Sequence, residues 1–396
     1  VVVNKPKTAA YRAPGQPQAA FCVESVMDEV AEKLGMDPME FRLLNAPHEG
    51  DRAPSGVPHA RFGCDEVEEA MKAHPHYNAP LSGPHQGRGV AVGYRLNGGG
   101  SGSSATINVN SNGTINLITG SVDIGGTRTS VAMQAAEILG IGIDDVSPTV
   151  VDTDAVGYTG GTNGSRITFD TGLAAILAAQ EVVRQMSDRA ALLWEVSADD
   201  VDFQDGTFIC KKNTEDKFSF KELAGKLMDT GGLVTCSSSD RQGGVGAQLA
   251  GHIVDLEVDP ETGKVDILRY TTFLDAGKAV YPTYVEGQMQ GSALQGIGWA
   301  LNEEYFLTED GTMANSSLLD YRMPTTLDMP MIDTVIIEVP NPRHPFGLRG
   351  VGETVIVPPL AAIANAISHA TGVRMTTLPM TPAVILEAIT SAQSNS

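Results

Sequence analysis

Strand and helix patterns are mixed irregularly along this chain, and that mixture constrains its fold more than any other feature. Apolar residues alternate on either side of short turns at 111–113, 205–206 and 259–263, which predicts hairpins there. Apolar residues at helical spacing predict helices at 17–35, 38–45, 129–139, 172–193, 285–301, 359–371 and 382–390. Because no regular strand–helix–strand repeat is present, we predict an α+β fold with mixed sheets and packed helices.

Stretches rich in proline, glycine and histidine indicate where the chain passes from one domain to the next. We predict a first part over residues 1–47, which begins with a strand at 1–10, and a linker region over 48–90. A larger domain follows over 91–390, and the polar residues 391–396 are expected to form a disordered tail. Since the sequence opens on Val-Val-Val-Asn without a Met, we expect a fragment or a processed piece of a longer subunit.

Composition argues against several classes of function. The chain carries 27 Lys and Arg against 48 Asp and Glu, a net charge of −21, so we expect neither nucleic acid nor an anionic membrane surface as a partner. The sequence contains no run of about 18 apolar residues, so we predict no membrane span. The four cysteines form no Cys-x-x-Cys pair, which argues against an iron–sulfur or zinc site and for a reducing, cytoplasmic location. The eight histidines show no metal-ligand spacing, so we predict no metal bound by protein ligands.

Two glycine-rich loops lead into predicted helices. Their glycine and polar residues are Gly125, Gly126 and Thr127 in one loop, and Thr162, Gly164, Ser165 and Arg166 in the other. Free N–H groups and the helix dipole favour a phosphate at such a place, and a guanidinium group strengthens the attraction. A further glycine run at 98–104 lacks the lysine of a nucleotide P-loop. Simple helix caps or flexible connections explain the same loops, and both interpretations stay open here.

Two later segments combine glycines with groups that can take part in chemistry. Gln288 and Gln295 lie on a glycine-rich predicted helix, where close packing against a ligand or against another helix explains the glycines. Glu353 follows Gly350 and Gly352 in a loop. A loop carboxylate of this kind can serve as a general base, and it can equally be a solvated surface group.

Five stretches, in order along the chain, resemble the molybdopterin-binding large subunit of the xanthine dehydrogenase / aldehyde oxidase family of molybdenum hydroxylases. They read AYRAPGQPQAAFCVESVMDEVAEKLGMDP, TNGSRITFDTGLAA, VEGQMQGSALQGIGWALNEE, LDYRMPTTLDMP, and PFGLRGVGE with PPLAAIANAISHATG. The resemblance implies two molybdenum-cofactor-binding domains. It makes residues 1–47 the end of the first domain and residues 91–390 the complete second one.

The resemblance also implies an activity and a set of partners. Members of the family hydroxylate an aldehyde or N-heteroaromatic carbon of a small molecule with oxygen from water. It implies a molybdenum–molybdopterin cofactor, with the cytosine dinucleotide form left open, in which the pterin dithiolene holds the metal. Another chain would supply the missing N-terminal cofactor domain. Electrons would pass to a 2Fe-2S subunit and an FAD subunit, since neither group is expected on this chain.

Site residues follow from the same resemblance. Glu353 matches the family's catalytic general base, and Arg12 matches the arginine of the loop beside molybdenum. The residues that the resemblance places against the cofactor are Ala13, Gly125, Gly126, Thr127, Thr162, Gly164, Ser165, Arg166, Gln288, Gln295, Gly350 and Gly352.

Departures from the family pattern narrow these expectations. Ala13 stands where carbon monoxide dehydrogenases have a copper-binding cysteine, and Pro14 stands where xanthine enzymes have a phenylalanine. Ala13 therefore argues against carbon monoxide oxidation, and Pro14 argues against purines as substrates. Gly126 stands where many relatives have a pterin-contacting glutamine. The alternative is therefore a non-catalytic assembly or scaffold fragment that keeps the fold. A weaker alternative is an unrelated phosphate-binding enzyme, for which no nucleophile is evident.

Overall fold

The computed structural model describes residues 9–53, 55–98, 101–240 and 245–395, so most of the strand expected at 1–10 lies outside the described residues. The chain folds into two compact units. The first unit consists of Val1–Leu96, Gly246–Pro342 and Val351–Ser396, and the second consists of Asn97–Val245 and Arg343–Gly350. The second unit is thus an insertion in the first, which differs from the linear division expected from the sequence.

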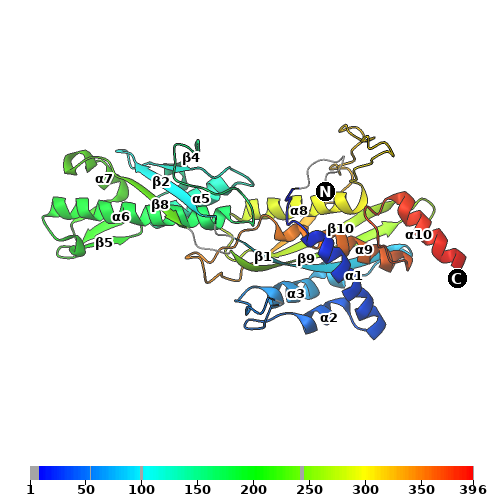
Figure 1. Ribbon diagram of the computed structural model, residues 1–396. Helices are drawn as coiled ribbons and strands as arrows, with labels where there is room; N and C mark the ends of the chain where they lie inside the picture. Colours follow the sequence, from blue (N-terminus) through cyan, green and yellow to red (C-terminus); the bar gives the residue numbers. More distant parts are fainter. Residues whose placement is uncertain (1–8, 54, 99–100, 241–244, 396) are drawn as a thin grey trace. The chain divides into compact units, whose positions relative to one another are not determined.

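A four-stranded sheet with the order β1-β9-β10-β11 forms the centre of the first unit (Figure 1). Its strands are β1 (Gln86–Asn97), β9 (Gly246–Val258), β10 (Val265–Asp275) and β11 (Ile332–Ile337). β9 and β10 form an antiparallel hairpin, whereas β10 and β11 run parallel. β9 is buried along almost its whole length, as expected of a strand with both faces covered.

Helices cover both faces of this sheet. They are α1 (Gln16–Leu34), α2 (Pro38–Asn45), α3 (Cys64–Ala73), α4 (Pro75–Asn78), α8 (Pro282–Leu301), α9 (Pro359–Thr371) and α10 (Pro382–Asn395). Val254 of β9 belongs to a core shared with α8, α9 and α10, whereas its neighbour Ile253 belongs to a core shared with α2 and α3. Consecutive strand residues point to opposite faces, so one strand serves two cores.

Helices α3 and α4 lie within residues 48–90, where we expect a linker region. α3 buries Cys64, Val67 and Met71, which are spaced so that they lie on one face of the helix and pack against β9 and β10. Prolines, glycines and histidines on either side of this short amphipathic segment are the reason that its pattern is missed in the sequence.

The other helices agree better with the sequence analysis. Each of the seven predicted helices begins within three residues of an observed one. α2 coincides with 38–45, because Asp37 caps the N–H groups of Met39 and Glu40. α10 differs most, since it continues to Asn395 through the stretch expected as a disordered tail. The packed helices and the sheets with both parallel and antiparallel pairs confirm the α+β class.

One stretch of the described residues, Thr354–Thr371, is long and apolar enough to cross a membrane by composition alone. It comprises the short helix η5 (Thr354–Ile356) and α9. Because 78% of this stretch is buried inside the structure, it is accounted for as the core helix of the first unit.

The second unit contains a sheet with the order β4-β3-β2-β8, in which β3 and β4 run parallel and the other pairs antiparallel. Helices α5 and α6 pack on this sheet, and the many alanines of α6 allow a close approach (Figure 1). A small sheet, β5-β6-β7, contributes Val201 and Phe208 to the same hydrophobic core as α6. The elements of the second unit are β2 (Ser103–Val109), β3 (Ile115–Thr119), α5 (Thr127–Leu139), η1 (Ile143–Asp145), β4 (Val146–Val150), η2 (Ile167–Thr171), α6 (Gly172–Trp194), η3 (Ala198–Asp200), β5 (Val201–Gln204), β6 (Thr207–Cys210), β7 (Lys217–Ser219), α7 (Phe220–Ala224), η4 (Leu227–Thr230) and β8 (Thr235–Asp240).

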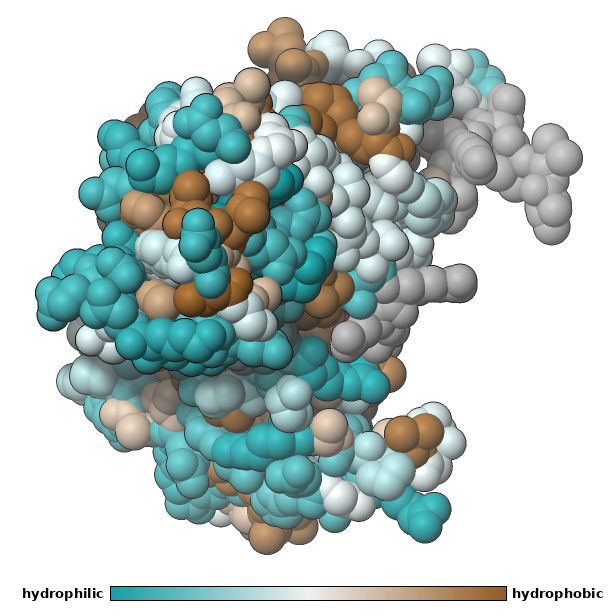
Figure 2. Space-filling model, turned by 90° about the vertical axis from the view of Figure 1, so that its left-hand side faces the viewer, coloured by the Kyte–Doolittle hydropathy of each residue, from teal (hydrophilic) through white to brown (hydrophobic). Residues whose placement is uncertain are grey.

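Hydrophilic residues predominate on one face of the molecule, and apolar side chains are scattered among them (Figure 2). This distribution fits a chain with a net charge of −21.

Candidate functional site

The residues predicted to form a site fall into two sets, one in each unit. The first unit holds Arg12, Ala13, Gln288, Gln295, Gly352 and Glu353, and the second holds Gly125, Gly126, Thr127, Thr162, Gly164, Ser165, Arg166 and Gly350. The structure brings the first set together through Arg12 and Glu353, and in the second set it packs Gly350 against Ser165.

Glu353 is held from two sides in the first unit. One carboxylate oxygen, Oε1, accepts a hydrogen bond from the main-chain N–H of Ala13 at 3.0 Å. The other, Oε2, pairs with Nη2 of Arg95 at 2.8 Å. The side chain of Glu353 is 14% exposed, so the carboxylate is largely shielded but still reaches the surface of the unit. Two donors on two oxygens fix the orientation of the carboxylate.

The loop that carries Ala13 has an unusual backbone. Ala13 is fully buried and has a φ of 51°, in the left-handed region that residues other than glycine rarely adopt. This conformation comes directly before α1 and accompanies the N–H contact with Glu353. Strained residues of this kind are typical of functional sites, where the surrounding structure holds them in place.

Arg12 ties three segments of the first unit together. Its Nε donates to the carbonyl oxygen of Gly352, next to Glu353 in the sequence. Its Nη1 donates to Oε1 of Gln295 at 3.2 Å, and its Nη2 donates to Oε1 of Gln288 at 2.9 Å. Burial lowers the pKa of Arg12 from its ordinary value, while Tyr11 and Glu353 act in the opposite direction. The side chain thus fixes the Glu353 loop to helix α8.

Helix α8 carries two exposed glycines beside Gln288, the partner of Arg12. Gly287 and Gly291 are exposed and lie one turn apart, and a Cβ atom at either would meet nothing within 4 Å. Gln288 uses its carbonyl oxygen for Arg12, and among the described residues its NH2 group has no hydrogen-bond partner. A side-chain-free surface with a free amide donor fits the face of a flat polar group such as a pterin.

Arg166, in the second unit, is fully buried, and its guanidinium is enclosed by its own loop, by Asp170 and by the start of β2. It pairs with Asp170 at 3.0 Å and donates to Oγ of Ser103 at 3.0 Å. It also donates to the carbonyl oxygens of Gly102, Gly160 and Gly161. The sequence predicts a guanidinium available to a ligand, whereas the structure uses it to shape the 160–166 loop.

Glycines allow this loop to be packed tightly. Gly164 and Ser165 both have left-handed backbones, with φ of 57° and 56°. A Cβ atom at Gly350 would lie 1.6 Å from the carbonyl oxygen of Ser165, so only glycine fits there. Thr162 is exposed at the tip of the loop. The 160–166 loop is therefore tightly built, with Gly350 as its close-packed neighbour.

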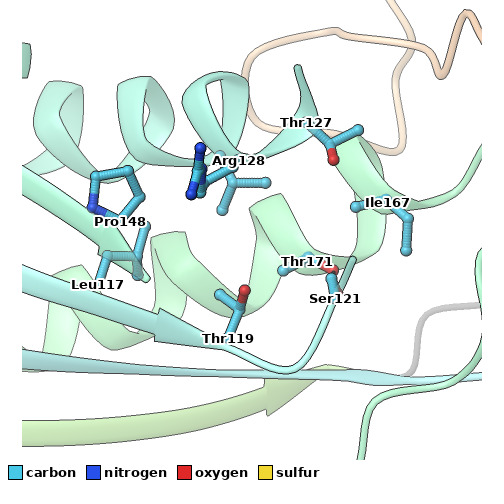
Figure 3. Close-up of a pocket in the computed structure, with 9 residues that line it drawn as sticks. Leu117, Thr119, Ser121, Thr127, Arg128, Pro148, Ile167 and Thr171 are labelled. Carbon is cyan, nitrogen blue, oxygen red and sulfur yellow. The ribbon is translucent and has the colours of Figure 1, made fainter. Parts of the chain in front are cut away.

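The other glycine loop ends at α5. Gly125 and Gly126 have φ of 63° and 79°, and α5 begins at Thr127. Near this helix start lies a small pocket of about 10 Å³, roughly the volume for one water molecule. Figure 3 shows Ser121 and Thr171 side by side below Thr127, and their hydroxyl oxygens are 2.8 Å apart. The helix N-terminus attracts an anion, but the pocket itself is too small for a cofactor.

A larger pocket of about 380 Å³ lies under α1 in the first unit. Apolar side chains provide most of its walls, and the buried pair of Glu24 and Arg42, 2.8 Å apart, also borders it. Glu68 is 3% exposed, and burial together with the charge of Glu24 raises its pKa to about 8.

The residues described contain no cluster of three or more His, Cys, Asp or Glu side chains that could hold a metal ion.

Sequence reasoning misses Arg95 and Gln16. Arg95 lies in β1, 258 residues before its partner Glu353, and no motif surrounds it. One signal was available in the sequence. In a strand, a residue between two exposed ones points to the buried face, so the charged Arg95 between Tyr94 and Leu96 needs a buried partner. Gln16 is the first residue of α1 and accepts a hydrogen bond from Arg95 at 2.7 Å.

Comparison with known proteins matches nearly the whole chain. Residues 66–330 match a family model described as a molybdopterin cofactor-binding domain, and residues 1–46 match a second model with that description. A protein of Escherichia coli O157:H7 named xanthine dehydrogenase molybdenum-binding subunit is 33% identical, over 97% of this chain and 54% of its own length. An aldehyde oxidoreductase of Megalodesulfovibrio gigas is 30% identical, over 98% of this chain and 42% of its own length.

A solved structure agrees with these matches. The crystal structure of quinoline 2-oxidoreductase from Pseudomonas putida 86 superimposes with a TM-score of 0.86 at 25% identity, over 96% of this chain and 53% of that one. The chain spans about half the length of the relatives it matches.

Proposed function

Since this chain belongs to the family of molybdopterin cofactor-binding domains, we propose that it forms the catalytic part of a molybdenum hydroxylase complex. The proposed reaction adds oxygen from water to a carbon of an aldehyde or an N-heteroaromatic compound. The observation that carries the proposal is the arrangement of Glu353, which is oriented by two donors beside the open glycine surface of α8.

The residues proposed to contact the cofactor follow from the two sets. In the first unit these are Gln288, through its free NH2 group, and the surface at Gly287 and Gly291. In the second unit they are the loops at 125–127 and 160–166, where main-chain N–H groups and a helix N-terminus suit the polar and anionic parts of the cofactor. When bound, a molybdenum–pterin group supplies a two-electron redox centre with the metal on its dithiolene.

The residues of this chain supply positioning and proton transfer. Glu353 accepts, at a carboxylate oxygen, the proton released when water-derived oxygen is added to the substrate carbon. Ala13 holds the other carboxylate oxygen through its N–H group, which limits rotation of the side chain. Arg12 keeps the Glu353 loop at a constant place relative to α8 through Gly352 and Gln288.

Aldehydes and N-heteroaromatic compounds are the proposed substrate class. Relatives are named for xanthine, aldehyde and quinoline chemistry, so the fold serves each of these types. Ala13 and Pro14 replace residues that the resemblance links to carbon monoxide and purine oxidation. Proposed partners are a chain with the rest of the first cofactor domain, a 2Fe-2S subunit and an FAD subunit. The relative named as a molybdenum-binding subunit supports an assembly of this kind.

We place the complex in the cytoplasm, a proposal supported by four cysteines that are all free thiols. The cofactor form is proposed to be molybdopterin or its cytosine dinucleotide, and mass spectrometry of the released cofactor distinguishes the two.

The proposal is tested on the complex purified from its native host. Molybdenum is quantified, and turnover of benzaldehyde and quinoline is measured with a dye as electron acceptor in water enriched in ¹⁸O. We expect about one molybdenum per chain and ¹⁸O in the product formed from quinoline, because benzaldehyde exchanges its own carbonyl oxygen with water. Product oxygen that comes from dioxygen instead of water contradicts the proposal.

A scaffold role is the second candidate, favoured by Gly126 in place of the glutamine of relatives. A complex that contains this chain but no molybdenum, with no turnover of either compound, supports that role and overturns the catalytic one.

A further inference from the structure

Helix α1 carries apolar side chains on two opposite sides. One side packs into the first unit, where Ala20, Phe21 and Ala31 are buried. The other side, which we call the outer face of α1, consists of Ala19, Cys22, Val23, Val26, Val30 and Leu34. Val23, Val26 and Leu34 are 58%, 57% and 60% exposed. Steps of three and four residues place these side chains together on one side of a helix.

Helix α6 shows how a helix of this chain looks where it faces water. Its exposed positions include Gln180, Arg184 and Asp188, which follow one another at intervals of four residues and are all polar. A helix that is apolar on one side only is typical of a surface helix, whereas a helix that is apolar on both sides is buried on both. The outer face of α1 therefore indicates an interaction surface.

The pocket under α1 continues this surface. Ala19 and Val23 belong to the outer face and also line the pocket of about 380 Å³, together with Val92 and Leu249 of the sheet. The pocket is far larger than one water molecule needs, and most of its walls are apolar. Since apolar walls gain free energy when side chains replace water, the outer face and the pocket form one surface suited to a protein partner.

Glu68 adds a polar requirement to this surface. It lines the pocket and is 3% exposed, and its Oε2 atom has no hydrogen-bond partner among the described residues. Buried polar atoms nearly always have such a partner. The neighbouring side chains of Glu24 and Arg42 already pair with each other at 2.8 Å. The occupant of the pocket therefore has to bring a polar group to Glu68 in addition to apolar side chains.

The family matches indicate what this occupant is. Residues 1–46, which contain α1 and α2, match a molybdopterin cofactor-binding domain model separate from the one that matches residues 66–330. The xanthine dehydrogenase molybdenum-binding subunit of Escherichia coli O157:H7 matches 97% of this chain with 54% of its own length. Helices α1 and α2 thus belong to a domain of which this chain carries a short part, and a helix packs against the core of its own domain.

We propose that the outer face of α1 and the adjoining pocket receive the rest of the first cofactor-binding domain. The proposal rests on the proposed function, which calls for such a partner, and it names the surface where that partner is held. Apolar side chains of the partner fill the pocket, and one of its polar groups meets Glu68. Helix α1 is then enclosed on both of its apolar sides.

The first test uses Cys22, which lies on the outer face. It is exposed, whereas Cys64, Cys210 and Cys236 are buried. The complex purified from its native host is treated with iodoacetamide, and the modified peptides are quantified by mass spectrometry. Leu192→Cys is the control, because Leu192 is 61% exposed on α6. We expect Cys22 to react about 10-fold more slowly than the control, or slower still, and equal rates overturn the proposal.

A cross-linking experiment identifies the occupant. The photoreactive amino acid p-benzoylphenylalanine replaces Val26, the assembled complex is illuminated, and the cross-linked peptides are sequenced by mass spectrometry. We expect the peptides to come from the rest of the first cofactor-binding domain. Cross-links to a second copy of this chain, to the 2Fe-2S subunit or to the FAD subunit overturn the proposal.

A pair of matched substitutions tests the energetics. Val26 and Leu192 are 57% and 61% exposed on their helices, so Val26→Gln and Leu192→Gln should behave alike if both sites face water. Glutamine favours a helix more than valine does, so Val26→Gln would then be neutral or slightly stabilising. Under the proposal it buries an amide and lowers the melting temperature of the complex by several degrees, whereas Leu192→Gln does not. Unchanged melting in Val26→Gln, or an equal fall in both variants, overturns the proposal.

These readouts are independent of molybdenum and turnover, so the two proposals fail separately. A complex without molybdenum and turnover, in which Val26 cross-links to the rest of the first cofactor-binding domain, overturns the catalytic function and supports the docking surface. A complex with full molybdenum and turnover, in which Cys22 reacts as fast as the cysteine of Leu192→Cys, overturns the docking surface and leaves the catalytic function in place.

Discussion

Two arginine–carboxylate pairs, one in each unit, lie beside glycine-rich loops and differ in how far they are enclosed. The pair of Arg166 and Asp170 is 3.0 Å apart, and its side chains are 0% and 1% exposed. The pair of Arg95 and Glu353 is 2.8 Å apart, and its side chains are 9% and 14% exposed. Of these two pairs, the first is enclosed in the interior and the second lies near the edge of its unit.

The difference separates a pair that supports the fold from a pair that we propose takes part in the chemistry. Arg166 donates hydrogen bonds both to its own loop and to Gly102 and Ser103 at the start of β2, which leaves little of its guanidinium for a ligand. Glu353 is oriented by two donors but stays close to the surface. Partial exposure allows a proton to be exchanged, whereas full enclosure does not.

Breaking the enclosed pair should have the largest effect on stability. Arg166→Met leaves the carboxylate of Asp170 buried without its charged partner, which we expect to cost about 3–5 kcal/mol in unfolding free energy. Arg184→Met is the control, because Arg184 pairs with Asp188 at the same i,i+4 spacing but on an exposed helix surface. Thermal melts of the two complexes should show a large fall for Arg166→Met and little change for Arg184→Met. Equal melting temperatures contradict the assignment of Arg166 to the fold.

A buried carboxylate whose pKa is raised, Glu68, extends the comparison. Burial raises the pKa of Glu68 to about 8 in the folded chain, against 4.5 as its ordinary value. The folded state therefore binds a proton more tightly than the unfolded state, and wild-type stability should fall as the pH rises from about 4.5 to about 8. We expect Glu68→Gln to remove this loss, which amounts to a few kcal/mol at most. Melting temperatures of both proteins at pH 5 and pH 8.5 check this, and parallel pH dependence counts against it.

Replacing Gly350, which packs on the 160–166 loop, should lower the stability by a smaller amount. Gly350→Ala places a Cβ atom 1.6 Å from the carbonyl oxygen of Ser165, so the loop and its neighbour must move apart. We expect a loss of about 1–3 kcal/mol, seen as a lower melting temperature. A melting temperature equal to that of the wild type shows that the two segments are not packed as described.

An exposed glycine on α8 should give the smallest change in stability. A Cβ atom at Gly287 meets nothing within 4 Å, so Gly287→Ala should stabilise the helix by less than about 1 kcal/mol. If this surface contacts the cofactor as proposed, the molybdenum content of the complex should fall although the fold is intact. Full molybdenum content in Gly287→Ala removes the α8 surface from the proposed contacts.

Local patterns made much of the fold predictable. Asp37 followed by Pro38 marks the start of α2, and the turn at 259–263 marks the hairpin of β9 and β10. Features that depend on distant residues were not accessible in this way. The burial of α3 depends on strands almost two hundred residues away, and the insertion of the second unit depends on contacts of 343–350 with the 160–166 loop.

The candidate site shows the same limit. The resemblance identifies Arg12 and Glu353. In the structure Arg12 donates a hydrogen bond to Gly352, the residue before Glu353, and Ala13, the residue after Arg12, donates one to Glu353 itself. It could not show that Arg95 pairs with Glu353, because the two are 258 residues apart and share no motif. It also could not show that the guanidinium of Arg166 is enclosed, because the residues that receive its hydrogen bonds include Gly102 and Ser103, more than sixty residues earlier.

The central claim is that the pair at the edge serves the chemistry and the enclosed pair serves the fold. The most direct measurement compares two neutral variants of equal shape, Glu353→Gln and Asp170→Asn, by turnover per bound molybdenum and by melting temperature. We predict that Glu353→Gln loses turnover by about 100-fold or more and keeps its melting temperature, whereas Asp170→Asn melts earlier and keeps its turnover per molybdenum. Near-normal turnover in Glu353→Gln, or a loss of turnover per molybdenum of the same size in Asp170→Asn, contradicts the claim.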